Sequence, residues 1–322
     1  MPLVHGTETI QSPLQKSSLD KKGLCDYVIN VASGCLHGCT FCYVPSTPVI
    51  RARQPFLKGK GVDDPQADWG RYLLVRENLA ERLEAQLSRK RTWKETSSGK
   101  GVVLLCSGTD PYQNQQAASI THSAIQSLIK YKKRIRVLTR SPLFLQDLSL
   151  LNHSDVTIGM SLPHLDDKLS RQIEPYAPPP SHRLEALHKA KKAGCRIFIA
   201  IAPTHPSMGV DAFTQHIDIL MELQPEVMFW EPINARGSNG KRMISAGIEF
   251  TSSVMQGKDW AANFIRQWDA IETAAEKLGC RDRLHIWPDP ALKSHVEEQR
   301  LQEWWYRPTI ERWQDGSPPD EQ

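Results

Sequence analysis

The segment Tyr27-Val-Ile-Asn-Val-Ala-Ser-Gly-Cys-Leu-His-Gly-Cys-Thr-Phe-Cys42 joins a short apolar run to three closely spaced cysteines. The run over residues 27–32 is β-branched and nearly continuous in apolarity, which predicts a strand covered on both faces. Cys35, Cys39 and Cys42 follow it at the spacing Cys-x3-Cys-x2-Cys. Three thiolates this close in a loop can reach three corners of an iron–sulfur cube and leave the fourth iron open for another ligand.

Other chemistries compete for these cysteines. Structural zinc takes four closed ligands, commonly as two paired knuckles, and the sequence has no second Cys-x2-Cys or His-x3-His pair. His37 could be a fourth ligand only through an awkward local fold. A redox dithiol and three unrelated buried cysteines are further alternatives. Outside the enzymes, the rival interpretation is a zinc or iron–sulfur binding module without catalysis.

Five more apolar runs predict strands that continue the series, at residues 102–106, 135–139, 156–160, 197–201 and 227–230. Amphipathic segments with helical spacing lie between the runs, at residues 75–87, 125–129, 144–151, 184–187 and 213–220. Gly194 is a suitable residue to end the helix before the fifth strand. Six strand–helix units in a row predict an α/β fold with a parallel sheet. Right-handed crossovers would curl it into a partial (β/α)6 barrel of the TIM type.

The pattern changes after Trp230. Residues 233–257 are rich in Gly, Ser, Asn and Arg and predict a long functional loop or lid. A helix over residues 259–278, capped by Gly279, and a short strand at residues 285–287 are expected next, followed by a tail that carries Trp304, Trp305 and Trp313. The predicted organisation is a polar N-terminal segment (1–22), the partial barrel (23–240), and a loop with a C-terminal helical extension (241–322).

The composition is that of a soluble globular protein. The 322 residues are 40% hydrophobic and 24% charged, with a formal net charge of +4. No run approaches 18 apolar residues, and residues 1–22 lack the apolar core of a secretory signal, so a cytoplasmic protein without a membrane span is expected. The basic runs at residues 89–91 and 130–136 are expected to be solvated helix ends. Cys25, Cys106, Cys195 and Cys280 are scattered, and each is expected to be a small core residue.

The cysteine motif and its setting resemble the radical S-adenosylmethionine (SAM) superfamily. Within it, the chain is similar to the spore photoproduct lyase-like group, often labelled DNA repair photolyase-like. The segments that carry the resemblance are Gly34-Cys-Leu-His-Gly-Cys-Thr-Phe-Cys-Tyr43, Cys106-Ser-Gly-Thr-Asp-Pro-Tyr-Gln113, Ile173-Glu-Pro-Tyr-Ala-Pro178 and Glu231-Pro-Ile-Asn234. The resemblance implies a 4Fe-4S cluster on Cys35, Cys39 and Cys42. It also implies reductive cleavage of SAM to methionine and a 5′-deoxyadenosyl radical, which abstracts hydrogen from a substrate.

The resemblance implies roles for further residues by position. Phe41 and Tyr43 would lie near the adenosyl group of SAM. The segment Ser107, Gly108, Thr109 and Asp110 would bind the methionine ammonium, although these residue types also form ordinary turns. Arg140 would bind the carboxylate, and Ser161 would contact ribose or carboxylate. The alternatives are a core tyrosine at Tyr43 and a surface charge at Arg140.

Cys106 lies near the position of a hydrogen-donating cysteine in the spore photoproduct lyases, but it could equally point into the core. Glu174 and Arg183 flank a Pro-rich turn and are expected to pair, in a structural role. Glu231, Asn234, Arg236 and Asn239 follow the sixth strand, where they could line a substrate entrance.

The resemblance implies a one-electron reductant such as flavodoxin or ferredoxin as a partner, but it does not identify the substrate. Repair of a nucleic-acid lesion and modification of a small molecule, peptide or RNA are the two candidates. Repair predicts that the basic runs flank the barrel mouth and that binding weakens steeply with salt.

Overall fold

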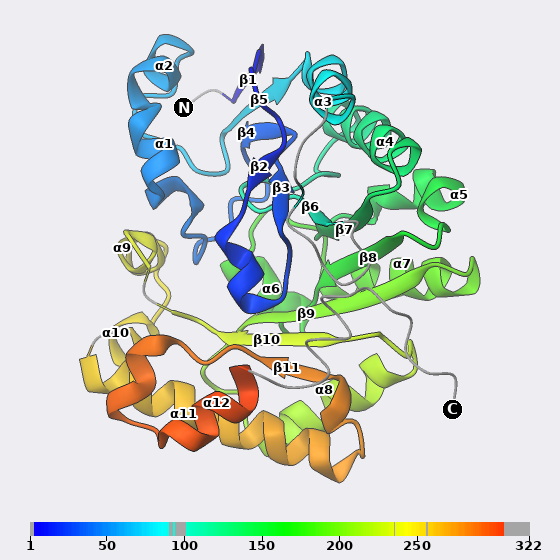
Figure 1. Cartoon of the computed structure of the whole chain (residues 1–322). Helices are drawn as coiled ribbons and strands as arrows, with labels where there is room; N and C mark the ends of the chain where they lie inside the picture. Colours follow the sequence, from blue (N-terminus) through cyan, green and yellow to red (C-terminus); the bar gives the residue numbers. More distant parts are fainter. Residues whose placement is uncertain (1–2, 90–92, 94–100, 235, 256, 306–322) are drawn as a thin grey trace.

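An eight-stranded sheet forms the centre of the molecule (Figure 1). The computed structural model describes residues 3–89, 93, 101–234, 236–255 and 257–305. The spatial order of the strands is β11 (Leu284–Ile286), β10 (Met228–Pro232), β9 (Arg196–Thr204), β8 (Val156–Ser161), β7 (Arg134–Thr139), β6 (Val102–Leu105), β3 (Tyr27–Ile29) and β2 (Gln15–Lys16). All neighbours are parallel except β2, which runs antiparallel to β3. The six predicted parallel strands are confirmed, the first of them over part of its range, and β11 confirms the short strand expected near residue 285.

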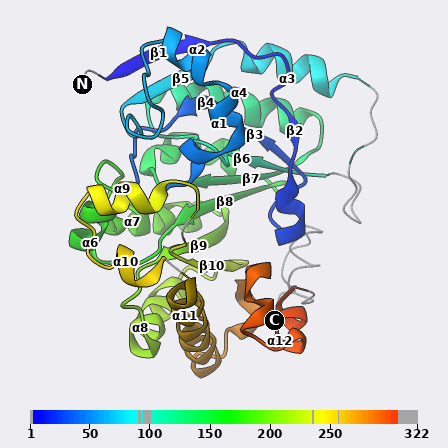
Figure 2. The same cartoon turned by 90° about the vertical axis from the view of Figure 1, so that its left-hand side faces the viewer.

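Helices connect consecutive parallel strands, as a series of βα units requires. After β6, β7, β8 and β9, respectively, come α4 (Gln115–Lys130), η3 (Pro142–Asp147) with α5 (Leu148–Leu151), α6 (Asp167–Ile173) with α7 (Pro180–Lys192), and α8 (Val210–Met221). Gly194, with φ of +86°, lies just after α7, where a left-handed residue ends the helix. The sheet curls without closing into a full barrel, which confirms the partial-barrel prediction (Figure 2).

A second, three-stranded sheet lies beside the first strand of the series. It contains β1 (Val4–Glu8), β5 (Tyr72–Arg76) and β4 (Ala32–Gly34). The strand predicted over residues 27–32 is therefore split: β3 stays in the large sheet, and the chain crosses to the small one at β4. The helix predicted from residue 75 is wrong at its start, because Val75 belongs to β5 and α3 (Leu79–Leu87) begins later. The run Tyr72-Leu-Leu-Val75 is buried between β1 and β4, and this pairing overrides its apparent helical spacing.

Short helices lie on both sides of β3 along the chain. They are η1 (Ser18–Lys22), which precedes β3, and η2 (Val44–Ser46), α1 (Pro48–Ala52) and α2 (Gln54–Gly59), which follow the cysteines. The segment after β10 contains α9 (Asn239–Ser245) and α10 (Thr251–Val254), so the long loop predicted there is wrong. Met243 and Val254 are buried, and their packing makes these turns helical.

The C-terminal helices pack on the sheet. The predicted helix is confirmed as α11 (Gly257–Lys277), which packs against α8. It is followed by η4 (Arg281–Arg283), η5 (Pro290–Ser294) and α12 (Glu298–Trp305). Trp268 and Trp304 are fully buried in the same core as the strands. Trp313 lies outside the described residues.

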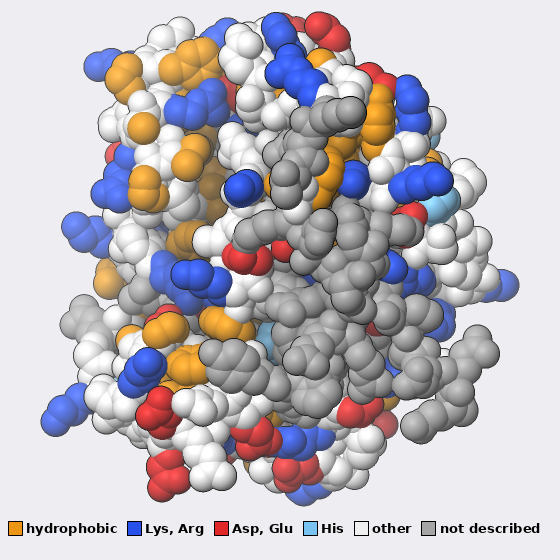
Figure 3. Space-filling model, viewed as in Figure 1, with side chains coloured by type: hydrophobic (Ala, Val, Ile, Leu, Met, Phe, Trp, Pro, Cys, Tyr) orange, Lys and Arg blue, Asp and Glu red, His pale blue; other side chains and the backbone are white. Residues whose placement is uncertain are grey.

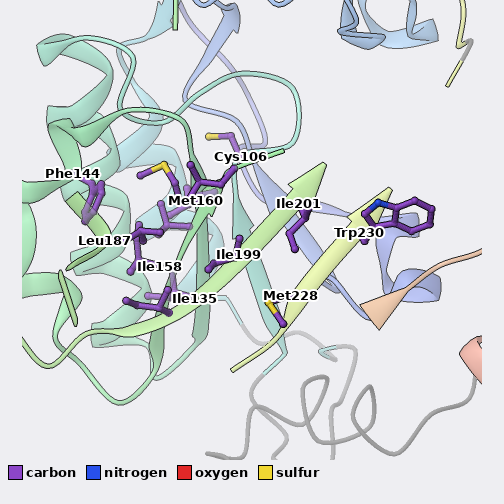
Figure 4. Close-up of a cluster of buried hydrophobic side chains, with 14 of the residues drawn as sticks. Cys106, Ile135, Phe144, Ile158, Met160, Leu187, Ile199, Ile201, Met228 and Trp230 are labelled. Atoms are coloured by element: carbon purple, nitrogen blue, oxygen red, sulfur yellow. The ribbon is translucent and has the colours of Figure 1, made fainter. Parts of the chain in front are cut away.

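The main core fills the space between the sheet and its outer helices (Figure 4). Strand residues such as Ile135, Ile158 and Ile199 point toward Phe144 and Leu187 from the helical layer. The alternate residues of each strand face the inside of the curved sheet. Cys25, Cys106, Cys195 and Cys280 are all buried in apolar clusters, which confirms the prediction that they are core residues.

The basic run at residues 130–136 is only partly a solvated helix end. Lys130 is exposed and pairs with Glu84, but Arg136 is buried in β7 and donates hydrogen bonds to the carbonyl oxygens of Gly23 and Leu24. The run enters β7 at its amino end, which is the end of the sheet opposite the cysteine loop. The run at residues 89–91 lies mostly outside the described residues.

Candidate active site

The cysteine loop follows β4 and depends on two glycines. Gly34 has φ of +87°, and a Cβ there would overlap the carbonyl oxygen and ring of Tyr72. Gly38 has φ of +60°, and its Cβ would lie 2.8 Å from the Tyr176 ring. Both positions therefore require glycine, and they allow Cys35 and Cys39 to sit on a tight, closely packed loop.

Hydrogen bonds from three distant segments hold this loop. The Thr40 amide donates to the carbonyl oxygen of Ile173 at the end of α6 over 2.9 Å. The Leu36 amide donates to Gln113 Oε1 over 2.7 Å. The Asn239 side chain donates to the carbonyl oxygen of Phe41 over 2.8 Å. The loop is thus fixed to the segments that follow β6, β8 and β10.

All three cysteines line one cavity of about 510 Å³. Burial raises the pKa of each thiol, to about 12 for Cys39, and neighbouring thiols add to the effect at Cys35. No three His, Cys, Asp or Glu side chains of the described residues converge where they could hold a single metal ion. Three thiols around a shared cavity, those of the buried Cys35 and Cys39 and of the half-buried Cys42, fit a cluster with one open iron.

The cavity extends from the cysteine loop across the inner face of the sheet. Its walls include the inward-facing residues of five strands or of the turns that follow them: Leu104, Cys106, Leu138, Arg140, Phe198, Ala200, Ala202, Phe229, Glu231, His285 and Trp287. Gly159 of β8 lacks a side chain, and the Phe198 ring occupies the space that a Cβ would need. The site lies at the carboxyl ends of parallel strands, where such folds place their active sites.

The segment Ser107–Asp110 lines this cavity, and its backbone is held by Asn30. Asn30 Oδ1 accepts hydrogen bonds from the Ser107 amide (3.0 Å) and the Gly108 amide (2.7 Å). The Thr109 hydroxyl donates to the carbonyl oxygen of Gly34 over 2.5 Å. The segment thereby joins the end of β6 to the start of the cysteine loop.

Asp110 is the centre of a buried polar cluster. It accepts hydrogen bonds from the Thr139 hydroxyl and the Arg140 amide, each over 2.7 Å. His37 Nε2 lies 3.1 Å from Asp110 Oδ2. Burial opposes ionisation of Asp110, but the His37 ring and these donors outweigh it and hold the pKa of the carboxyl below its usual value. The sequence did not predict the His37–Asp110 pair. The signal that could have predicted it is the histidine inside the cysteine motif, because a buried histidine needs a polar partner.

Arg140 takes part in a second buried cluster. Its Nε donates to Glu174 Oε1 over 2.6 Å, and Arg183 donates to Glu174 Oε2 over 2.7 Å. Burial alone would raise the pKa of Glu174, but the two guanidinium groups lower it to about 2. The predicted Glu174–Arg183 pair is confirmed. Arg140 also lines the cavity, with its guanidinium carbon 5.6 Å from the centre of the Phe41 ring.

Aromatic and charged residues lie beside the third cysteine. Phe41 and Tyr43 both line the cavity, and Tyr43 is 42% exposed. Arg236 lies over the Tyr43 ring and pairs with Glu231 over 2.7 Å. Thus Glu231 and Arg236 line the cavity as expected of an entrance. Asn234 and Asn239 are buried and hydrogen-bond around this segment instead.

Ser161 does not line the cavity. It is buried at the end of β8, in register with Ala200 of β9, and its carbonyl oxygen accepts a hydrogen bond from Arg183. Cys106 does line the cavity and is 3% exposed. Among the predicted site residues, all line this cavity except Ser161, Asn234 and Asn239.

Comparison with known families identifies the class of enzyme. Residues 29–219, more than half of the chain, match the family model described as the Radical SAM superfamily. The chain belongs to the radical SAM superfamily. It is a radical SAM enzyme, and this family uses a 4Fe-4S cluster together with SAM and requires a one-electron reductant.

Sequence relatives extend the match without naming a substrate. The uncharacterized protein ORF301 of Acidianus two-tailed virus is 32% identical over 224 residues, covering 66% of this chain and 69% of the viral protein. An uncharacterized Mycobacterium tuberculosis protein is 26% identical over 200 residues, covering 61% of this chain. The match spans 54%, about half, of that mycobacterial relative.

Solved structures show the fold. A spore photoproduct lyase with one cysteine replaced by serine has a TM-score of 0.59 and 14% identity, covering 88% of this chain and 80% of that one. A spore photoproduct lyase double mutant with bound AdoMet and dinucleoside spore photoproduct has a TM-score of 0.58 and 13% identity over the same shares. The chain thus shares the lyase fold. Among its described helices, none has the length and apolarity to cross a membrane.

Proposed function

We propose that Cys35, Cys39 and Cys42 hold the cluster and that the substrate is attacked in the cavity that these cysteines line. When bound, the reduced cluster supplies the electron that splits SAM into methionine and a 5′-deoxyadenosyl radical, which abstracts a hydrogen atom from the substrate. The observation that carries the proposal is the shared cavity, because it places three thiols, Cys106 and an aromatic wall around one space.

The remaining residues of the cavity would bind and orient SAM. Arg140 offers a guanidinium to the carboxylate, and the Ser107–Asp110 segment offers backbone and side-chain oxygens to the ammonium. Phe41 and Tyr43 offer aromatic surface beside the third cysteine. Asp110 already accepts several hydrogen bonds, so its part is to hold Arg140 and His37 in place as much as to bind the cofactor. The Ser161 contact stays a prediction without support from the cavity lining.

Cys106 is suited to donate a hydrogen atom to the product radical: its S–H bond would break, a C–H bond would form, and the thiyl radical left on Cys106 would regain one electron from the one-electron reductant and one proton from water. Burial raises the pKa of its thiol to about 12, so the sulfur keeps its hydrogen at neutral pH. The thiol lies in the same cavity as the cluster cysteines. We therefore include a hydrogen-donor role for Cys106 in the proposal.

The position of the charges favours modification of a small molecule or peptide over action on a nucleic acid, whether DNA or RNA. The basic run at residues 130–136 enters β7 at the end opposite the cysteine loop, whereas repair of a DNA lesion predicts basic runs around the mouth. The inner wall carries Phe198, Phe229 and Trp287, which suits one apolar or planar group of a substrate. Lesion repair is the second candidate, and the lyase fold together with Cys106 in the cavity favours it.

Anaerobic reconstitution tests the chemistry. The protein loaded with iron and sulfide and reduced with dithionite should convert SAM into methionine and 5′-deoxyadenosine. Stoichiometric zinc without SAM cleavage would support a binding module instead. Deuterated SAM should then be incubated separately with irradiated DNA, RNA, peptides and small-molecule pools. Transfer of label to DNA, with binding that weakens steeply with salt, would select repair; transfer to another pool would select its class.

A further inference from the structure

A second hollow, of about 660 Å³, lies on the outer side of the cysteine loop. Its walls come from the loop itself, residues 64–71, the turn after α6 and the helix α9. We call it the outer groove. It shares only Trp69 with the lining of the inner cavity, so the cysteine loop forms the wall between the two spaces.

The wall between the groove and the cluster ligands is thin. Tyr176 is 66% exposed, and its ring packs on Gly38, between the first two cysteines. The Tyr176 amide donates to the carbonyl oxygen of His37 over 3.3 Å. On the other side, Arg242 of α9 donates to the carbonyl oxygen of Cys42. A molecule seated in the groove would therefore lie one residue away from the cluster ligands.

The groove is positively charged. Arg71, Lys241 and Arg242 line it, against Asp64 as the acidic residue of its lining. Within the described part of the chain, neither Arg71 nor Lys241 forms a side-chain ion pair. Figure 3 shows Lys and Arg side chains along the side of the molecule that carries α1, α2 and α9. Unpaired cations around a hollow favour an acidic partner.

Substrate chemistry does not explain this groove, because the loop backbone separates it from the cavity that Cys106 and the aromatic wall line. An electron has no such restriction, since it can cross a thin layer of protein, and its transfer slows steeply with distance. A donor must therefore dock where the cluster comes closest to the surface.

We propose that the outer groove is the docking site of an acidic one-electron donor of the flavodoxin or ferredoxin type, with Lys241 and Arg71 as its main contacts. The inference rests on the proposed cluster assignment. In the transfer, the reduced donor loses one electron and the oxidised cluster gains it; no bond forms or breaks, and the donor leaves oxidised.

Charge reversal in the groove tests the proposal. In Lys241→Glu and Arg71→Glu, a purified bacterial flavodoxin should bind the reconstituted protein about tenfold more weakly in calorimetry, because each change replaces attraction by repulsion. Flavodoxin-driven SAM cleavage should fall in parallel, while dithionite-driven cleavage stays unchanged, because this small reductant needs no docking surface. Lys192→Glu, on the exposed end of α7 away from the loop, makes the same charge change and should bind flavodoxin as the wild type does.

The possible results separate failure of the docking site from failure of the proposed function. Equal flavodoxin affinity in the wild type and the groove variants, or no binding of either flavodoxin or a ferredoxin to the wild type, would overturn the docking site. If the groove variants lose affinity for a single-stranded oligonucleotide and keep flavodoxin binding, the groove is a nucleic-acid surface and the proposal is wrong. A wild type that binds flavodoxin but cleaves no SAM with dithionite would contradict the proposed function and leave the docking site supported.

Discussion

At the scale of single residues, the buried thiols define the chemistry of the site. Burial raises the pKa of Cys35, Cys39 and Cys42, so the metal-free protein holds these cysteines protonated. A cluster binds thiolates, and loading must therefore release protons. The assembled site should lose its metal more readily as the pH falls.

The first prediction concerns Cys42. Cys42→Ala removes one of three ligands, and the reconstituted variant should lose the brown iron–sulfur absorption and all SAM cleavage. Absorption spectra, iron content and 5′-deoxyadenosine formation measure this. Cys195→Ala is the control, because it also removes one thiol, but Cys195 lies outside the cavity. Retained cleavage in Cys42→Ala would refute the cluster assignment.

The second prediction concerns Cys106. A thiol exchanges its hydrogen with solvent, so a product formed in D2O should carry one deuterium if Cys106 donates the atom. Cys106→Ala should still cleave SAM, but its product should lack that deuterium. Mass spectrometry of the product, once the substrate class is identified, measures the label. The same label in both proteins would exclude Cys106 as the donor.

At the scale of elements, a buried carboxylate joins the ends of β7, α6 and α7. Glu174 is ionised with a pKa near 2, below its usual 4.5, because Arg140 and Arg183 outweigh the cost of burial. A lowered pKa in the folded state stabilises the protein above about pH 4.5. That contribution is lost as the pH falls through about 2.

The third prediction follows from this network. Glu174→Gln leaves two guanidinium groups without their partner and should lower the free energy of unfolding by about 3–5 kcal/mol at pH 7. The difference from the wild type should shrink as the pH falls from 4.5 toward 2. Urea unfolding at several pH values measures it. Glu185→Gln, which removes an exposed ion pair with Lys189, should change little; a Glu174→Gln effect that does not vary with pH would contradict the assignment.

The fourth prediction concerns the contact between β8 and β9. In Gly159→Ala the new methyl group would lie 2.0 Å from an atom of the Phe198 ring, which is fully buried, so the ring must shift. Overpacking of this kind should cost about 1–3 kcal/mol of stability. The double variant with Phe198→Leu should recover part of the loss in thermal unfolding. A single variant as stable as the wild type would show that the inner wall is looser than its packing indicates.

At the scale of the whole molecule, the C-terminal segment shares the core of the partial barrel. β11 extends the sheet beside β10, and α11 packs on α8. Phe264, Trp268 and Trp304 belong to the same buried cluster as the strands. The predicted boundary at residue 240 marks a change in sequence pattern. It is a domain boundary only if residues 1–240 fold without the rest of the chain.

The fifth prediction is that residues 1–240 alone do not fold cooperatively. Truncating a buried Phe or Trp to Ala costs about 3–5 kcal/mol, whereas whole domains are stable by about 5–15 kcal/mol. Loss of Phe264 and Trp268 together would therefore remove much or all of the stability. Thermal unfolding of the fragment beside the full chain measures this. A soluble fragment with a sharp transition would support a boundary at residue 240.

Much of the fold could be predicted because its signals are local. The six parallel strands are short apolar runs with amphipathic helical segments between them, and each run can be recognised from about a dozen residues. The splitting of residues 27–34 between two sheets was not predictable, because it depends on β5, which lies some forty residues further along the chain. Val75 was misassigned for the same reason: its partners β1 and β4 are distant in sequence.

The sequence by itself determined the three cysteines, their spacing and their place early in a βα series, and the family resemblance that these features carry predicted the class of enzyme. Only the tertiary structure decided what surrounds them: His37 against Asp110, Arg140 on Glu174, Cys106 inside the cavity, and an outer groove behind the loop. The physical reason is the separation along the chain of the residues that interact. Spacing within a loop follows from covalent geometry, whereas a buried ion pair or a groove forms only where separate segments pack together.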